Sequence, residues 1–269
     1  MIASAFVDVT VVPMDEERLL EGQTVVVQEG KIASVGPTEQ SNLPEEVQRI
    51  DGGGRYLMPG LVDMHVHYNE PSFAALFIAH GITTVRNMWG SPIHLRARDL
   101  IARGEGFGPN IYTCGPLMDG DPPWWPGSAV IETAEEAERS VAEQKEQGYD
   151  FLKVYSNLKR EAYDAIVSAA GKYDIRFVGH VPERVGLAHA LASGQASIEH
   201  LHGYLTAIMR DGAPEMSGTL TDRTIGWTEH ADQDTLGSGS NPRRERLELR
   251  HADREPKNGG STADVRAGV

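Results

Sequence analysis

A repeated alternation of short apolar runs with helix-forming segments, from about residue 58 onward, constrains the fold more than any other feature of this sequence. In chain order the runs read "VDMHVH", "ITTVRNM", "PNIYTCGPL", "YDFLKVYSN", "IRFVGHVP" and "ASIEH". Because each helix returns the chain to the same edge of the sheet, the strands must be parallel. We predict an α/β fold, a (β/α)8-type (TIM-like) barrel that is incomplete, with about six βα units. An open doubly wound sheet is the alternative, although no Gly-rich phosphate loop marks it.

Two of the helix-forming segments carry end signals. Thr133 and Glu136 in "TAEE" have the spacing of a capping box. Ser72 is placed to cap the segment "FAALFIAHG", and Gly81 stands at its C-terminal end. These signals support the alternation of strands and helices.

Residues 1–57 are Val-rich and read as strands, with "EGK" as a hairpin turn. We predict that they form the β-strand portion of a small sandwich domain. The partial barrel then spans residues 58–230, and a polar, non-barrel tail, which we predict to be disordered, spans residues 231–269.

The tail contains no strand-forming run. After Trp227 the chain has no aromatic residue, isoleucine or methionine, and the sequence becomes rich in Arg, Gly, Pro and Asp. One interpretation is an ordinary disordered tail. The interpretation that we favour is a change of reading frame or ancestry near Leu236, because the Arg-rich segment begins where two more βα units are due.

Charge and composition limit the partners. The formal net charge of -14 argues against nucleic acid or an anionic membrane as a partner. Cys114 is the one cysteine, which excludes an internal disulfide and suits a reducing cytoplasm. The N-terminus lacks the basic region of a signal peptide, and no apolar stretch approaches membrane-spanning length. We expect a soluble, cytoplasmic protein.

Four histidines and a lysine stand at or near the ends of the predicted strands. His65 and His67 are two residues apart at the end of the first, so their side chains share a face and could chelate one metal ion. Lys153 lies in the fourth strand, and His180 and His200 end the fifth and sixth. Each alone could be a structural or solvent-facing residue. Together they would meet at the barrel's C-terminal end, where TIM-barrel active sites lie, and we interpret them as a metal site.

The setting of Lys153 is unusual for a lysine. Its neighbours Phe151, Leu152, Val154 and Tyr155 make the strand apolar on both faces. A buried lysine needs a partner or a changed charge state, whereas a surface lysine would not.

The motifs "HVH" at 65–67, "LKVY" at 152–155, "GHVP" at 179–182 and "IEH" at 198–200 together resemble the amidohydrolase superfamily. Within it they resemble the imidazolonepropionase-like and prolidase-like hydrolases, as does the entry segment "PGLVDMHVH". The resemblance covers roughly residues 1–230 and implies a metal-dependent hydrolase of amide or peptide C–N bonds, possible substrates being small peptides and cyclic amides.

The resemblance also implies the roles of the site residues. Two divalent cations would sit at the barrel end, the first held by His65 and His67 and the second by His180 and His200. Lys153, carboxylated by carbon dioxide, would bridge them. Imidazole and oxygen ligands favour Zn²⁺, with Mn²⁺, Fe²⁺ and Co²⁺ left open. A water acidified to hydroxide by the metals would attack the substrate carbonyl.

One residue that the family pattern requires is missing, namely an aspartate at the end of the eighth strand. Asp222 in "GTLTD" stands where a seventh strand would end, so we assign no catalytic residue. The alternative function is therefore a truncated, non-catalytic remnant that binds metal without turnover. Tyr155 and His202 share strand faces with Lys153 and His200 and are our candidate substrate-binding residues. Trp124 and Trp125 could wall the pocket or cover a helix.

A barrel without two strands has free edges. The first and sixth strands would expose unpaired backbone groups, which promote association. We predict that the isolated chain folds poorly or forms homo-oligomers through these edges. Light scattering that shows a monodisperse monomer, together with a sharp melting transition, would contradict this prediction.

Overall fold

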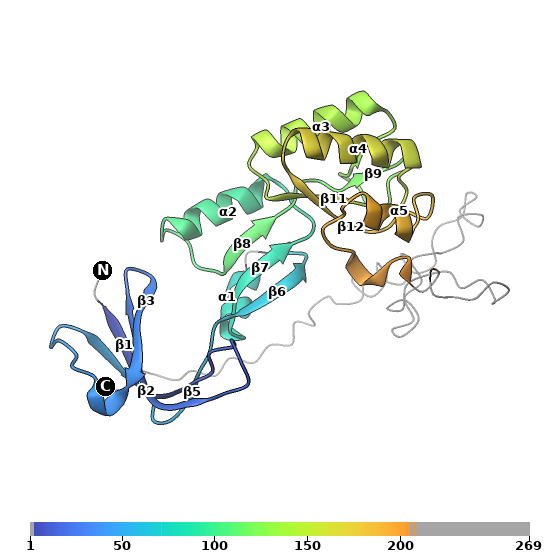
Figure 1. The fold of residues 1–269 in the computed structure, drawn as a ribbon. Helices are drawn as coiled ribbons and strands as arrows, with labels where there is room; N and C mark the ends of the chain where they lie inside the picture. The colour runs from blue at the N-terminus through green and yellow to red at the C-terminus, as the bar shows by residue number, and fades with distance from the viewer. Residues whose placement is uncertain (1–2, 71, 205–206, 208–269) are drawn as a thin grey trace, which may run out of the picture. The chain divides into compact units, whose positions relative to one another are not determined.

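The computed structural model describes residues 3–70, 72–204 and 207 (Figure 1). Its N-terminal part is one five-stranded sheet built around β1 (Ser4–Val11). β1 pairs antiparallel with β2 (Leu20–Gln28), and β2 pairs antiparallel with β3 (Lys31–Pro37). On its other side β1 pairs in parallel with β4 (Gln48–Asp51) and β5 (Tyr56–Leu57), and η1 (Thr38–Gln40) follows β3.

The turn between β2 and β3 confirms the predicted hairpin. Glu29 and Gly30 have φ angles of 51° and 74°. Positive φ at both central residues is the geometry of a tight turn that matches the twist of the two strands. A second sheet, which would make this part a sandwich, is not found among the described strands.

The rest of the described chain alternates parallel strands with helices, as the sequence predicts. Two sheets, β6-β7-β8 and β10-β9-β11-β12, contain only parallel pairs. In chain order the elements are β6 (Leu61–Val66), α1 (Phe73–Ala79), β7 (Ile82–Asn87), α2 (Pro92–Ala102), β8 (Asn110–Thr113), β9 (Met118–Asp119), β10 (Ala129–Val130), α3 (Ala134–Glu146), β11 (Phe151–Val154), α4 (Arg160–Lys172), β12 (Arg176–Gly179), α5 (Leu187–Ala192) and η2 (Glu199–Leu201).

Two single bridges join these strands into one succession. Cys114, just after β8, pairs in parallel with Phe151 of β11, and Gly179 of β12 pairs in parallel with Ile198. The succession β6, β7, β8, β11, β12 and Ile198 thus follows the order in the sequence, as it does in a (β/α) barrel, while β10 pairs only with β9, outside this succession. The described part of the chain contains no pairing that closes the succession into a ring.

The structure corrects the first and last predicted strands. The apolar residues before "VDMHVH" predict that the first strand begins at Tyr56, but this run is divided, since Tyr56–Leu57 pairs with β1 while β6 begins at Leu61. Pro59 lacks a backbone N–H, which interrupts strand pairing at this point. The sixth strand is reduced to the bridge at Ile198, because η2 begins at the next residue.

One helix cap is confirmed and one is wrong. The Thr133 hydroxyl accepts from the Glu136 backbone N–H, and the Glu136 carboxylate accepts from the Thr133 N–H, which completes the capping box. Ser72 precedes α1, but its backbone is helical and its side chain makes no cap hydrogen bond. Gly81 follows α1 with φ +75°, as expected of a residue that ends a helix.

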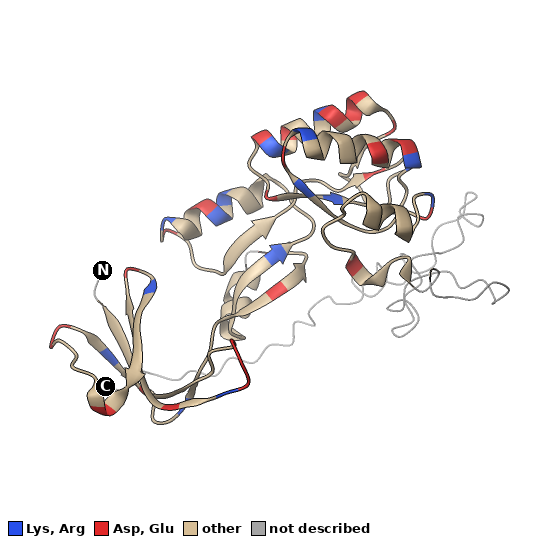
Figure 2. Cartoon of the chain, viewed as in Figure 1, with Lys and Arg blue, Asp and Glu red and all other residues tan. Residues whose placement is uncertain are grey.

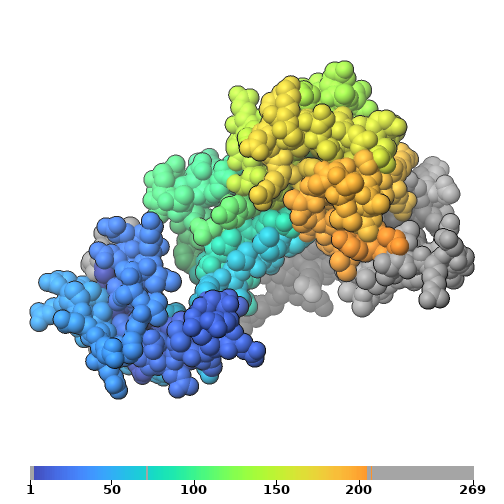
Figure 3. Space-filling view, in the orientation of Figure 1, coloured from blue at the N-terminus to red at the C-terminus, as the bar shows by residue number. Residues whose placement is uncertain are grey.

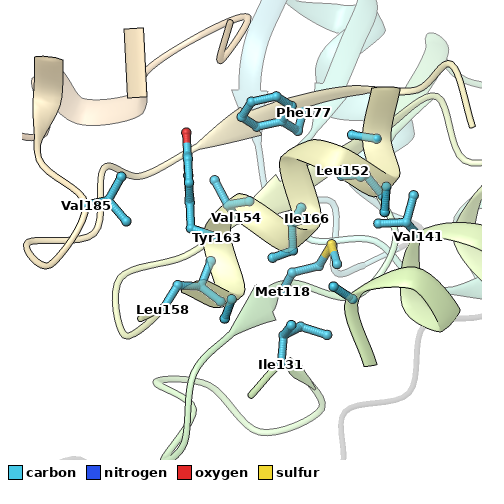
Figure 4. Close-up of a cluster of buried hydrophobic side chains, with 14 of the residues drawn as sticks. Met118, Ile131, Val141, Leu152, Val154, Leu158, Tyr163, Ile166, Phe177 and Val185 are labelled. Carbon is cyan, nitrogen blue, oxygen red and sulfur yellow. The ribbon is translucent and has the colours of Figure 1, made fainter. Parts of the chain in front are cut away.

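The main core lies between the strands and the helices α3 to α5. Figure 4 shows Met118, Leu152 and Val154 of the strands facing Ile166 of α4. The side chains of α3 and α4 also pack against each other in the space-filling view (Figure 3). Charged residues are concentrated on the helices, while the strands are mostly uncharged (Figure 2). This is the pattern of a parallel sheet covered by amphipathic helices.

None of the helices in the described ranges is long and apolar enough to cross a membrane. Asp222 and the tail 231–269 lie outside the described residues, as does most of the segment "GYLTAIMRDG", which the sequence pattern predicts to be helical.

Gly179 provides a test of the strand arrangement. Its φ is +130°, and a Cβ there would lie 2.2 Å from the Val154 carbonyl oxygen on the neighbouring strand. We predict that Gly179→Ala lowers the free energy of unfolding by at least about 2 kcal/mol, since it adds backbone strain to a steric clash. Chemical denaturation measures this change.

The control variant is Gly171→Ala, in α4. A Cβ at Gly171 meets nothing within 4 Å. An alanine in a helix is more favourable than glycine by about 0.5–1 kcal/mol, so this variant should be as stable as the parent or more stable. Equal stability of the two variants would contradict the strand register described here.

Candidate metal centre

The first pair of candidate ligands lies at the end of β6. His65 is in the strand and His67 follows its last residue, Val66. The two imidazole rings stack, with 5.5 Å between centroids and 26° between planes. Val66 between them is buried in the cluster that faces α1 and α2. The two histidines therefore project from the opposite, inner face, as the spacing of two predicts.

The second group lies at the ends of β11 and β12. Lys153 and His180 are each only 1% exposed. The Tyr155 ring lies between them, 4.1 Å from the His180 ring and 5.5 Å from Lys153 Nζ, in both cases to the ring centroid. Ser156 Oγ is 2.8 Å from His180 Nδ1. A lysine, an imidazole and a phenol therefore lie close together in the protein interior.

Strand pairing explains why these side chains meet. In the register of β11 and β12, Lys153 is opposite Val178, and Val154 is opposite Gly179. The chain leaves β12 at Gly179, and the His180 N–H donates to the Val154 carbonyl. All of β11 is buried, which confirms that Lys153 sits in a strand that is buried on both faces.

Three residues near His65 were not predicted as site residues. His65 Nδ1 is 2.6 Å from Glu199 Oε2. The other carboxylate oxygen, Oε1, accepts from Arg86 Nη2 at 2.7 Å and from Ser197 Oγ at 2.6 Å. A charged Arg86 within the β-branched run "ITTVRNM" was a signal in the sequence, because a strand of that kind is normally apolar.

Glu199 is ionised in this setting. Burial would raise the pKa of its carboxyl group, but the hydrogen bonds from His65 and Ser197 and the charge of Arg86 outweigh burial and lower the pKa to about 2. A buried carboxylate requires such compensation.

Aromatic residues connect the two groups of candidate ligands. The His67 ring makes an edge contact with Trp89, 5.8 Å between centroids, and Trp89 contacts Trp125 at 5.4 Å. Trp125 Nε1 donates to the Tyr155 hydroxyl at 2.9 Å, and Tyr155 stacks on His180. These rings form a continuous wall, which we call the aromatic wall (Trp89, Trp125 and Tyr155).

A buried aspartate anchors the tryptophan loop. Asp119 is fully buried and accepts backbone N–H groups of Gly120, Trp124 and Asn157. Burial raises the pKa of Asp119 despite these hydrogen bonds. The carboxyl group thus ties the segment that carries Trp124 and Trp125 to the end of β11.

The remaining predicted residues, His200 and His202, belong to the second compact unit of the chain, which begins at His200. Their rings are 5.9 Å apart, and His200 has a positive φ of 56° in η2. Such a conformation is uncommon for a non-glycine residue. Within the described residues, no three side chains of His, Cys, Asp or Glu are grouped closely enough to hold a metal ion by themselves.

The donors present nevertheless fit a divalent cation. Metal-binding histidines normally give their second nitrogen to a hydrogen-bond partner. His65 has such a partner in Glu199 and His180 has one in Ser156, both at Nδ1. Because Nδ1 is engaged in both rings, Nε2 is the candidate ligand atom of each, and borderline-soft cations such as Zn²⁺ accept imidazole nitrogen.

No protein-family model matches the sequence, but comparison with known proteins finds similar sequences and structures. The chain is 40% identical over 72 residues to adenine deaminase of Ruegeria sp. (strain TM1040), a match that covers 25% of this chain and 12% of that enzyme. The structure of bottromycin amidohydrolase matches with a TM-score of 0.64 and 27% identity, covering 74% of this chain and 43% of that one.

A crystal structure of a Xaa-Pro dipeptidase has the same fold, with a TM-score of 0.63 and 21% identity over 74% of this chain and 61% of that one. The chain thus spans about half of the solved structures that it matches. These similarities support an amidohydrolase-superfamily fold for this chain.

The thiol of Cys114 tests the apolar layer next to this centre. Cys114 is fully buried with Met88, Phe151 and Val178. Burial raises the pKa of the thiol to about 12, so the reactive thiolate is absent at neutral pH. We expect no labelling by a thiol reagent in the native protein and complete labelling in denaturant, measured by mass spectrometry. Rapid labelling of the native protein would contradict this packing.

Proposed function

We propose that this chain provides metal-binding residues of a metal-dependent hydrolase that cleaves amide or peptide C–N bonds in small substrates. The observation that carries the proposal is the burial of Lys153 beside His180 and Tyr155, at the end of two parallel strands. The names of the relatives support the reaction class, since one is an amidohydrolase and another a deaminase.

The chemistry of Lys153 favours a carbamate. A buried ammonium group beside cations would be repelled, and burial favours the neutral amine. The neutral amine attacks carbon dioxide, a C–N bond forms, and one proton leaves to water. The product carries one negative charge spread over two oxygens, which can bind two cations at once.

The proposed ligands are His65 and His67 for one cation and His180 and His200 for the other, with Lys153 between them. Two zinc ions are the proposed occupants, because imidazole and carboxylate-type oxygens suit zinc. When bound, such cations polarise a carbonyl group and acidify a water molecule. The Nδ1 contacts at Glu199 and Ser156 orient the His65 and His180 rings for this role.

The substrate side of the proposal rests on the aromatic wall. Tyr155 and the two tryptophans present ring faces and edges next to His67 and His180. Ring surfaces favour apolar parts of a substrate, while the Tyr155 hydroxyl can form a polar contact. Small peptides and cyclic amides both have this character. His202 stays a second candidate substrate contact.

The proposed reaction also needs a group that moves a proton between water and the leaving nitrogen. The family pattern assigns this role to an aspartate, and Asp222, the residue that we considered, lies outside the described residues. A protein that binds metal without turnover is therefore the alternative function.

The test combines metal analysis, turnover and one variant. We expect the purified protein to contain stoichiometric zinc and to hydrolyse members of a dipeptide and cyclic-amide panel, with loss of activity on treatment with a chelator. Lys153→Ala should abolish turnover and remove the carbamate carbon signal, detected by NMR after equilibration with ¹³C-bicarbonate.

Lys145→Ala is the matched control. Lys145 lies in the last turn of α3 and donates to the Asp174 carbonyl on the surface, so its loss should change neither metal content nor rate. Bound metal without turnover of any panel member would select the non-catalytic alternative. A protein without stoichiometric metal would overturn the proposal.

A further inference from the structure

We infer that Glu199 is a positioning residue that fixes the ring tautomer of His65, with Arg86 and Ser197 holding the carboxylate in place. The inference rests on the proposed function, because it concerns how His65 is prepared to bind a cation. It assigns a role to three residues that the proposed metal site does not itself include.

The carboxylate is held from two sides. Oε2 faces His65 Nδ1 at 2.6 Å, and Oε1 receives Arg86 Nη2 and Ser197 Oγ at 2.7 and 2.6 Å. The Glu199 side chain is 7% exposed and that of Arg86 is 16% exposed. Buried, charge-assisted hydrogen bonds of this kind are strong, and their geometry is specific.

Arg86 is itself fixed. Its Nε donates to the Met64 carbonyl at 2.7 Å, and Nη1 donates to Ser197 Oγ at 3.1 Å. The guanidinium group therefore connects the β6 backbone to the segment that carries Ser197 and Glu199. Lysine could not reproduce this arrangement, because it lacks the planar set of donors.

The tautomer follows from the chemistry of the carboxylate. An ionised carboxylate only accepts hydrogen bonds, so His65 Nδ1 must carry the hydrogen. In the neutral ring the lone pair is then on Nε2. That nitrogen can bind a cation without first moving a proton, which lowers the free-energy cost of binding.

The same geometry makes an unusual prediction for Glu199→Gln. The glutamine carbonyl oxygen would stay with its two donors, Arg86 and Ser197, and the NH₂ group would then face His65 Nδ1. Because NH₂ only donates, Nδ1 would have to accept, and the ring hydrogen would move to Nε2. The isosteric substitution would thus block the nitrogen that binds the cation.

Glu199→Ala removes the carboxylate without introducing a donor. Water can then accept from Nδ1–H, so the ring keeps access to both tautomers. We expect zinc affinity to fall in the order wild type, Glu199→Ala, Glu199→Gln, with a loss of about 10–100-fold for the glutamine variant. A purely structural role predicts the opposite order of the two variants, since glutamine preserves the shape of the side chain.

Two measurements test the inference. Competition of the metal-free protein with a chromophoric zinc chelator gives the affinity. Long-range ¹H–¹⁵N NMR of protein with ¹⁵N-labelled histidine gives the tautomer of His65 in the absence of metal, with the signal assigned by its loss in His65→Gln. We expect Nδ1–H in the wild type and Nε2–H in Glu199→Gln.

The matched control is Asp164→Asn. Asp164 also joins a histidine and an arginine, His189 and Arg160, at 2.5 and 3.1 Å, but it lies on the surface outside the candidate centre. This variant should keep the wild-type zinc affinity and the His65 tautomer, and melting curves of all variants verify that they are folded.

The outcomes separate the two proposals. If the wild type binds no zinc, the proposed function fails, while the tautomers in the metal-free proteins still decide the present inference. Nε2–H in the wild type, or glutamine and wild-type proteins with the same tautomer and affinity, would overturn it. An affinity order in which glutamine is milder than alanine would also overturn it.

Discussion

Parallel hydrogen bonding runs from β6 through β7 and β8 to β11 and β12, and the candidate residues of these strands take their positions from it. Side chains alternate between the two faces of each strand. Val66, Val85 and Ile111 pack toward the helices, so His65 and Arg86 must face the other way. One pairing pattern therefore fixes both the apolar layer and the group of polar residues on the inner face.

Burial of charged groups on the inner face costs free energy, because it removes them from water. Glu199 is compensated by Arg86 and by hydrogen bonds from His65 and Ser197, which is why its carboxyl group stays ionised. Lys153 lies at the end of an entirely buried strand, where the proposed carbamate would change the sign of its charge. Below these groups, the apolar cluster of Met88, Cys114, Phe151 and Val178 fills the inner face. The buried charged groups, whose burial is unfavourable, thus lie near the strand ends that carry the candidate ligands.

An amidohydrolase-superfamily fold is consistent with these features, and the relatives that the chain matches are named as hydrolytic enzymes. The chain spans about half of the matching structures, so activity and substrate stay proposals. The described residues include the partners of His65 and His180 at Nδ1, which are Glu199 and Ser156. His200 and His202 are defined only within their own unit.

The sequence by itself determined the order of strands and helices, the hairpin at Glu29–Gly30 and the capping box at Thr133, because period, turn residues and caps are local signals. It also indicated His65, His67, Lys153 and His180, because each stands at or near the end of an apolar run. It could not identify Glu199 and Arg86 as partners, because they lie 113 residues apart in the chain and meet only in the folded protein. The break between Leu57 and Leu61, the reduction of the sixth strand to one bridge, and the aromatic wall were likewise decided by tertiary structure. The physical reason is that contacts between distant segments depend on register and packing, which no local pattern encodes.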